Sequence, residues 1–278
     1  MLESRKPQVF RGSETGPRTP LNADPLDRPG SRLPNFEVHQ LELARVELPE
    51  FHPEAPGSDT VYGFLVRDDR ACVLVDTGVG IGNNLIDRLY KPERIELSDA
   101  LAKVGVYIRD ITTVVNSHLH FDHCGNNFLF PGIPILVQEV ELDAARQQHY
   151  TVPNWVDFAG ANYVPIRGMH VISKNLKVFP TPGHTPGHQS LVVSSGSNTE
   201  IIVAQAAYSA REFQLFYDNL TDVCNAEMDR CLESNATWSS ESYIKSLADL
   251  RRLRPDKAHF SHDSAIWRSN KTMKTVVG

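Results

Sequence analysis

The amino-acid sequence predicts a mixed α/β protein. Short runs of β-branched and apolar residues, at 71–75, 112–115 and 133–137, have the length and composition of buried strands. Between residues 239 and 253, by contrast, apolar side chains recur every three or four positions, which is the spacing of an amphipathic helix. Periodicity places strands and helices along the chain but does not decide how the sheets are layered.

Length, charge and composition argue against several functional classes, including nucleic-acid-binding and membrane-spanning proteins. The 278-residue chain is long enough for one substantial core or two closely packed halves. Its formal net charge of −6 and the absence of a basic run argue against a nucleic-acid partner. The sequence has no run of about 18 apolar residues, and its N-terminus lacks the apolar segment of a secretory signal, so we expect no membrane span and no export. The four cysteines lack close-paired metal spacing, which fits reduced thiols in a cytoplasmic protein.

The first residues differ in composition from the rest of the chain. Residues 1–34 are rich in Pro, Arg, Ser and Gly and contain few apolar side chains, so we expect an extended or disordered arm. One domain then follows over residues 35–278. Such an arm either wraps a partner subunit or is a floppy tail, and its composition is compatible with both.

The domain is expected to begin with strands at 38–43, 60–66 and 71–75. The third is almost entirely apolar, so it belongs at the centre of a sheet. Further along we expect helices at 98–103 (capped by Ser98), 139–148 and 239–253, and strands at 112–115, 133–137, 176–179, 190–193, 201–204 and 257–261. The aromatic residues between His149 and Tyr163 indicate a pocket wall, a dimer face or ordinary packing beneath a loop.

The most informative stretch, SHLHFDHCG, directly follows the expected strand at 112–115. It contains the pattern H-x-H-x-D-H, formed by His118, His120, Asp122 and His123. Imidazole and carboxylate groups are good ligands for a borderline ion such as zinc. Ligands at a strand end and in the following turn can converge on one point. The competing interpretation, a polar loop with scattered histidines, is weaker because so dense a group after an apolar strand rarely serves packing.

Two further histidines lie in comparable settings. The segment TPGHTPGH at 181–188 contains two prolines and two glycines, which hold the turn stiffly so that His184 projects as a metal ligand should. The triplet SHD at 261–263 lies at the end of the last expected strand and contributes His262.

These motifs, together with the triplet DTG at 76–78 and Tyr208, resemble the metallo-β-lactamase superfamily of metal-dependent hydrolases. Within it, the chain is most similar to the N-acyl-homoserine lactonase-like branch. The resemblance covers residues 61–262 and implies an αββα sandwich with the metal site at one edge of the two sheets. It also implies that Asp76 braces neighbouring backbone without binding metal, that His188 supports its loop by hydrogen bonds, and that the protein is a homodimer.

The resemblance also implies two metal positions. Carried over residue by residue, the first is held by His118, His120 and His184, and the second by Asp122, His123 and His262. The family normally adds an aspartate that bridges both ions, and in the lactonase branch it stands in an Asp-x-x-Tyr pattern. Here Tyr208 keeps its place, but Gln205 occupies the aspartate position.

The glutamine matters because an anionic bridge offsets the repulsion between two dications a few ångströms apart. A neutral carboxamide does not, so we expect weaker binding of at least one metal, or a single metal. Asp218 and Asp222 lie downstream at a spacing that does not fit the strand end. Gln205 is compatible with a site tuned to different chemistry, with an inactive subunit beside an intact homologue, and with an engineered inactivation.

The function implied is metal-dependent hydrolysis of a small molecule, with a metal-bound hydroxide attacking a lactone or ester carbonyl. Asp122 orients the nucleophile and later passes a proton to the leaving oxygen. Tyr208 donates a hydrogen bond to the carbonyl or oxyanion, with core packing as its alternative role. Two Zn²⁺ ions are the expected cofactors, or one if Gln205 dismantles a position, and iron, manganese and cobalt are alternatives.

Two other functions remain open. The same chemistry applied to another activated C–O bond, such as an aryl ether or aryl ester, suits the aromatic residues around Trp155. A weakly active or non-catalytic subunit paired with an active homologue would follow from the loss of the bridging carboxylate at position 205.

Overall fold

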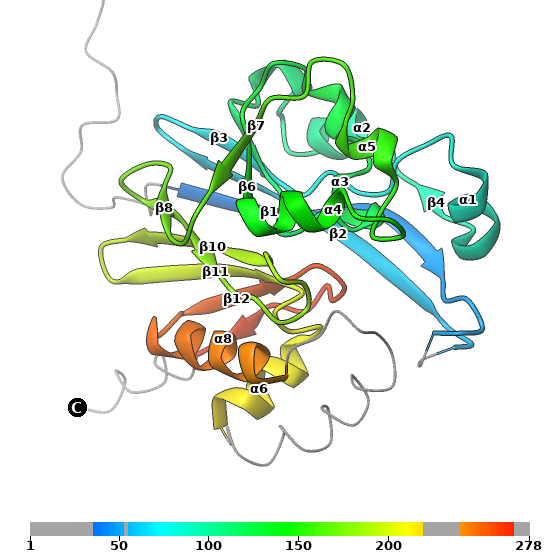
Figure 1. The fold of residues 1–278 in the computed structure, drawn as a ribbon. Coiled ribbons are helices and arrows are strands. Elements are labelled where there is room, and N and C mark those ends of the chain that lie inside the picture. Colours follow the sequence, from blue (N-terminus) through cyan, green and yellow to red (C-terminus); the bar gives the residue numbers. More distant parts are fainter. Residues whose placement is uncertain (1–35, 53–54, 219–239, 270–278) are drawn as a thin grey trace, which may run out of the picture. The chain divides into compact units, whose positions relative to one another are not determined.

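Two β-sheets with helices on their outer faces make up the part of the chain that the computed structural model describes, residues 36–52, 55–218 and 240–269 (Figure 1). The expected arm at 1–34 lies outside the described residues, as do Cys224 and Cys231. The mixed α/β prediction is confirmed, and so is the αββα layering that the resemblance implied. None of the described helices combines the length and apolar character that a membrane crossing requires.

The first sheet has seven strands in the order β4-β1-β2-β3-β5-β6-β7. They are β1 (Phe36–Glu47), β2 (Ser58–Asp68), β3 (Cys72–Val75), β4 (Glu93–Arg94), β5 (Thr113–Val115), β6 (Ile135–Gln138) and β7 (Tyr163–Ile166). β1 pairs antiparallel with both β4 and β2, and β2 pairs antiparallel with β3, whereas β3, β5, β6 and β7 run parallel. Every residue of β3 and β6 is buried, as parallel strands covered on both faces require.

The second sheet has six strands in the order β13-β12-β11-β10-β9-β8. They are β8 (His170–Val171), β9 (Leu176–Pro180), β10 (Gln189–Ser195), β11 (Asn198–Ala204), β12 (Lys257–Phe260) and β13 (Trp267–Arg268). Only β11 and β12 pair in parallel among these described strands. Their carboxyl ends therefore lie at the same edge, and Gln205 and Ser261 follow them directly.

The helices cover the outer faces of the sheets. The first sheet is flanked by α1 (Asn84–Tyr90), α2 (Leu97–Ala102), α3 (Phe121–Cys124), α4 (Glu139–Ala145) and α5 (Pro153–Val156), and the second by α6 (Ala210–Asp218) and α8 (Ser240–Arg252) (Figure 1). Two short 3₁₀ helices lie at Ile108–Asp110 and Asn127–Leu129. In β3, Val73 and Val75 pack between the sheets while Leu74 packs under the helices, because side chains alternate along a strand.

Several local expectations differ from the structure. The helix expected at 98–103 begins one residue earlier, and its cap is Glu96 without a side-chain capping hydrogen bond, so Ser98 does not cap it. The helix expected at 139–148 ends at Ala145. Helices α3 and α5 have four residues each, which is too short for a periodic apolar pattern to reveal them.

Candidate metal centre

Three histidine side chains meet at the edge where the central strands end. His118 and His120 follow β5, and His184 comes from the loop between β9 and β10. Nε2 of His118 lies 3.1 Å from Nδ1 of His120, and Nε2 of His184 lies 3.2 Å from that same atom. One nitrogen from each ring therefore faces a common point, as three imidazole ligands of a tetrahedral ion do. We call these residues the first group.

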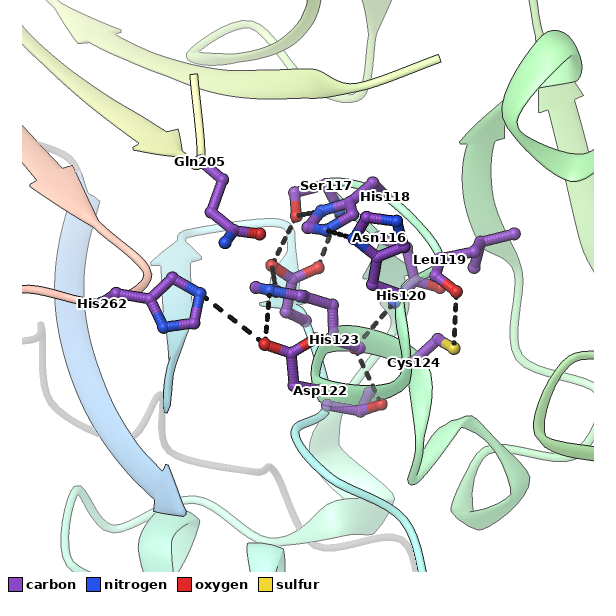
Figure 2. Close-up of polar contacts among 12 residues, drawn as sticks. Asn116, Ser117, His118, Leu119, His120, Asp122, His123, Cys124, Gln205 and His262 are labelled. Carbon is purple, nitrogen blue, oxygen red and sulfur yellow. Dashed lines mark hydrogen bonds and ion pairs between the residues drawn. The ribbon is translucent and has the colours of Figure 1, made fainter. Parts of the chain in front are cut away.

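A second group consists of Asp122, His123 and His262, whose ligand atoms lie within 4.8 Å of one another. Asp122 and His123 stand in α3, and His262 follows β12. Oδ2 of Asp122 lies 3.3 Å from Nε2 of His123 and 3.7 Å from Nε2 of His262. The rings of His118 and His123 are 4.1 Å apart, so the two groups are neighbours (Figure 2).

A close contact between two backbone segments holds α3 in place. The N–H of Thr77 donates to the carbonyl of His123 at 2.7 Å, and the N–H of Gly125 donates to the carbonyl of Gly78 at 2.9 Å. A Cβ on Gly125 would lie 1.9 Å from the nitrogen of Gly80. Gly125 has an ordinary helical φ of −62°. Glycine is therefore needed at 125 because the backbones approach so closely, and not because the chain turns there.

Asp76 braces both groups, as the resemblance implied. It accepts hydrogen bonds from the backbone N–H of Ser117 (2.7 Å), from Oγ of Ser117 (2.7 Å) and from Nδ1 of His123 (2.9 Å). Oγ of Ser117 in turn lies 3.0 Å from Nδ1 of His118. Because Nδ1 of each ring is engaged in this network, the tautomer is fixed and Nε2 is left to face the site.

Asp59 in β2 does the same for His262. One of its carboxylate oxygens lies 3.1 Å from Nδ1 of His262, and that nitrogen also lies 3.2 Å from the carbonyl oxygen of Thr60. No sequence signal points to Asp59, because it lies in a strand far from His262 along the chain and belongs to no motif.

Gln205 reaches the site from the second sheet together with His262, opposite the segment that carries the other labelled residues (Figure 2). Its side chain is 6% exposed, and Oε1 has no hydrogen-bond partner among the described residues. The backbone N–H of Gln205 donates to Nε2 of His188 at 3.2 Å, while Nδ1 of His188 lies 2.9 Å from Oγ1 of Thr181. His188 thus supports the loop, as expected, and belongs to neither group.

Tyr208 lies beside both groups. Its ring centroid is 5.9 Å from that of His262, against which it stacks, and 6.1 Å from that of His184, which it meets edge-on. Its backbone N–H donates to the carboxylate of Glu212 at 2.6 Å, which anchors the residue at the start of α6. The ring of Tyr208 therefore contacts a histidine of each group, and its role toward a substrate remains a prediction.

The two groups differ in protonation. Burial lowers the pKa of His118 and His184 well below the usual range and that of His120 to about 4, so these rings are neutral. Burial also acts to lower the pKa of His123, but the carboxylates of Asp122 and Asp76 outweigh it and raise that pKa to about 10. For Asp122, burial acts to raise the pKa, and the neighbouring His123 and His262 lower it overall.

This donor set fits a pair of metal ions. The first group offers three neutral nitrogens, and the second offers two nitrogens and one carboxylate oxygen. The buried Oε1 of Gln205 adds a neutral oxygen that no protein donor occupies among the described residues. Imidazole with a minority of oxygen ligands is typical of zinc and other first-row ions.

The other acidic, aromatic and histidine residues near the motifs belong to neither group among the described residues. His259, in β12, is buried, its Nε2 lies 3.1 Å from a carboxylate oxygen of Glu200, and it belongs to neither group. Asp218 accepts a hydrogen bond from Gln214 at the surface, and Asp222 lies outside the described residues. Trp155 packs in a hydrophobic cluster with residues of β1 and β2.

A protein-family model matches this chain independently of the structure. The model described as the metallo-beta-lactamase superfamily matches residues 56–262. The match covers well over half of the chain, which therefore belongs to this superfamily.

Several proteins that this chain is similar to are N-acyl homoserine lactonases. An N-acyl homoserine lactonase from a Bacillus species is 30% identical over 169 residues, which cover 55% of this chain and 66% of that protein. The chain thus matches just under two thirds of the length of that relative. A solved quorum-quenching N-acyl homoserine lactone lactonase is 25% identical with a TM-score of 0.63, covering 82% of this chain and 92% of that one. The dizinc quorum-quenching lactonase AidC shares the fold at 20% identity, with a TM-score of 0.58 over 84% of this chain and 89% of that one.

Proposed function

We propose that this protein hydrolyses the ester bond of a lactone or a related small-molecule ester. The observation that carries the proposal is the placement of a three-histidine group directly beside an Asp-His-His group, at the edge where the strands of both sheets end. The likeness to N-acyl homoserine lactonases supports a lactone as the substrate class.

In this proposal the first group holds one metal ion and the second group holds another. Divalent ions at such positions supply Lewis acidity, which activates water and polarises a carbonyl group at neutral pH. Asp122 is ionised, so its carboxylate accepts a proton from the attacking water and returns it to the leaving oxygen. The hydroxyl of Tyr208 donates a hydrogen bond to the substrate oxygen on which negative charge develops.

Gln205 gives this centre an unusual charge. With a carboxamide at that position, Asp122 is the only carboxylate in the two groups. Repulsion between two dications is then offset by one fewer negative charge than in the family pattern. We therefore propose that the chain has one tight and one weak metal position, with Oε1 of Gln205 acting as a neutral ligand.

Elemental analysis of protein purified without chelator, combined with a substrate panel, tests the proposal. The panel contains N-acyl homoserine lactones, aryl esters and an aryl ether. We expect bound metal and lactone hydrolysis. His184→Ala should lose hydrolysis and the metal ion of the first group, whereas His39→Ala, which changes a histidine outside the two groups, should retain hydrolysis and all of the metal. A chain that binds no metal and cleaves no lactone would refute the proposal. If the chain cleaves only the aryl esters or the aryl ether, these compounds replace lactones as the proposed substrate class.

A further inference from the structure

A buried carboxylate that the proposed chemistry does not use lies behind the first group. Glu141, in the first turn of α4, has no exposed surface. Two donors reach its Oε1 and two reach its Oε2: the N–H of Leu119 at 2.8 Å, the hydroxyl of Tyr150, Oγ1 of Thr185 at 2.7 Å and the N–H of Gly187 at 3.1 Å. Burying a carboxylate costs free energy unless several hydrogen-bond donors replace the water molecules that would otherwise solvate it.

Three of the four donors come from two separate segments, and each of these segments carries ligands of the first group. Leu119 stands between His118 and His120, and its N–H bonds to Oε1. Thr185 directly follows His184, and its hydroxyl bonds to Oε2. One side chain thus ties together the two segments whose imidazole nitrogens must meet.

The close approach of Gly187 to Glu141 also indicates that α4 supports the loop of the first group, independently of these hydrogen bonds. A Cβ on Gly187 would lie 2.4 Å from Cβ of Glu141 and 2.5 Å from its backbone nitrogen. The loop that carries His184 therefore rests directly on the first turn of α4. The ring of Tyr150, which shares Oε1, lies 5.0 Å from the ring of His120.

The second group is supported by other carboxylates. Asp76 engages His123, and Asp59 engages His262. Glu141 has no hydrogen bond to any residue of the second group among the described contacts. Its removal should therefore affect the two metal positions unequally.

We propose that Glu141 is a positioning residue for the metal position formed by the first group. It acts through the backbone of Leu119 and through Thr185, and it touches neither metal nor substrate. This inference rests on the proposed function insofar as the first group must bind a metal ion.

The test measures zinc affinity by competition with a chromophoric chelator in chains that keep one group each. The His262→Ala chain retains the first group and the His184→Ala chain retains the second. Introducing Glu141→Gln should weaken zinc binding roughly 10- to 100-fold in the His262→Ala chain, the usual loss when an outer support of a ligand is removed. Binding in the His184→Ala chain should be unchanged. Thr185→Val, which removes only one donor, should give a smaller loss in the same chain.

The outcomes separate the two proposals. Equal losses in both chains, or no loss in either, would overturn the role of Glu141 while leaving the metal centre intact. If the parent chain binds no zinc and cleaves no lactone, the proposed function fails, and the role of Glu141 fails with it. If the parent chain binds zinc but the His262→Ala chain does not, the role of Glu141 is overturned and the proposed function stands. The melting temperature of the metal-free protein shows whether Glu141→Gln folds. If it does not fold, Thr185→Val alone decides whether zinc affinity is lost only in the His262→Ala chain or equally in both chains.

Discussion

Replacing Gln205 with glutamate adds one negative charge at the proposed centre and changes almost nothing else, because the two side chains have the same size. A unit charge about 4 Å from a divalent ion contributes about 2 kcal/mol with water-like screening and about 8 kcal/mol at an effective dielectric constant of 20. Gln205 is only 6% exposed, so the screening lies between these limits. The lower limit corresponds to roughly 30-fold tighter binding of the weaker ion.

Titration of chelator-stripped protein with zinc, in competition with a chromophoric chelator, measures both affinities. We expect Gln205→Glu to tighten the weaker one and to raise the melting temperature of the zinc-loaded chain. The same substitution should lower the melting temperature of the metal-free chain, because the new carboxylate is then buried where Oε1 of Gln205 finds no hydrogen-bond donor among the described residues. Gln205→Ala, which removes the oxygen and adds no charge, is the control and should not tighten binding. A Gln205→Glu chain with both affinities unchanged would refute the reasoning.

Three further predictions concern the mechanism, the pH dependence and the packing of the site. Tyr208→Phe should lower kcat for a lactone roughly 100-fold at unchanged metal content, and an unchanged rate would remove Tyr208 from the mechanism. Zinc binding by the second group should tighten as the pH rises from 6.5 to about 10, because zinc must displace the proton of His123, whose pKa is raised to about 10. The protonated ring stabilises the metal-free fold fully below pH 6.5 and ceases to do so as the pH passes about 10, so urea unfolding should show stability falling across that window. Zinc binding by the first group, whose histidines are neutral, should show no such dependence, and the single-group chains used for Glu141 separate the two. Gly125→Ala should lower the free energy of unfolding, measured by urea denaturation, by about 1–3 kcal/mol, because the new Cβ has no room beside Gly80. A Gly125→Ala chain as stable as the parent would contradict the close backbone contact.

Predictions that rest on residues close together in the sequence agree well with the structure. The buried strands β3, β5 and β6 lie within a residue or two of their expected positions, because a short apolar run contains the information for a buried strand. The H-x-H-x-D-H pattern packs four candidate ligands into six positions, so their proximity follows from covalent connectivity alone. The placement of α3 does not follow in the same way, because hydrogen bonds from Thr77 and Gly125 join the backbone of α3 to the distant segment that contains Thr77 and Gly78.

What the sequence by itself determined is the α/β class, the superfamily, and the chemical types and spacing of the candidate ligands, including the neutral residue at position 205. Apart from Asp76, whose bracing role the resemblance implied, tertiary structure alone decided which carboxylates support those ligands. Asp59 belongs to no motif, and Glu141 stands in the first turn of a short helix, where an acidic residue ordinarily faces solvent and favours the helix dipole. Both become partners of the site because strand pairing and helix packing bring distant segments together, and no local pattern in a single chain records that contact.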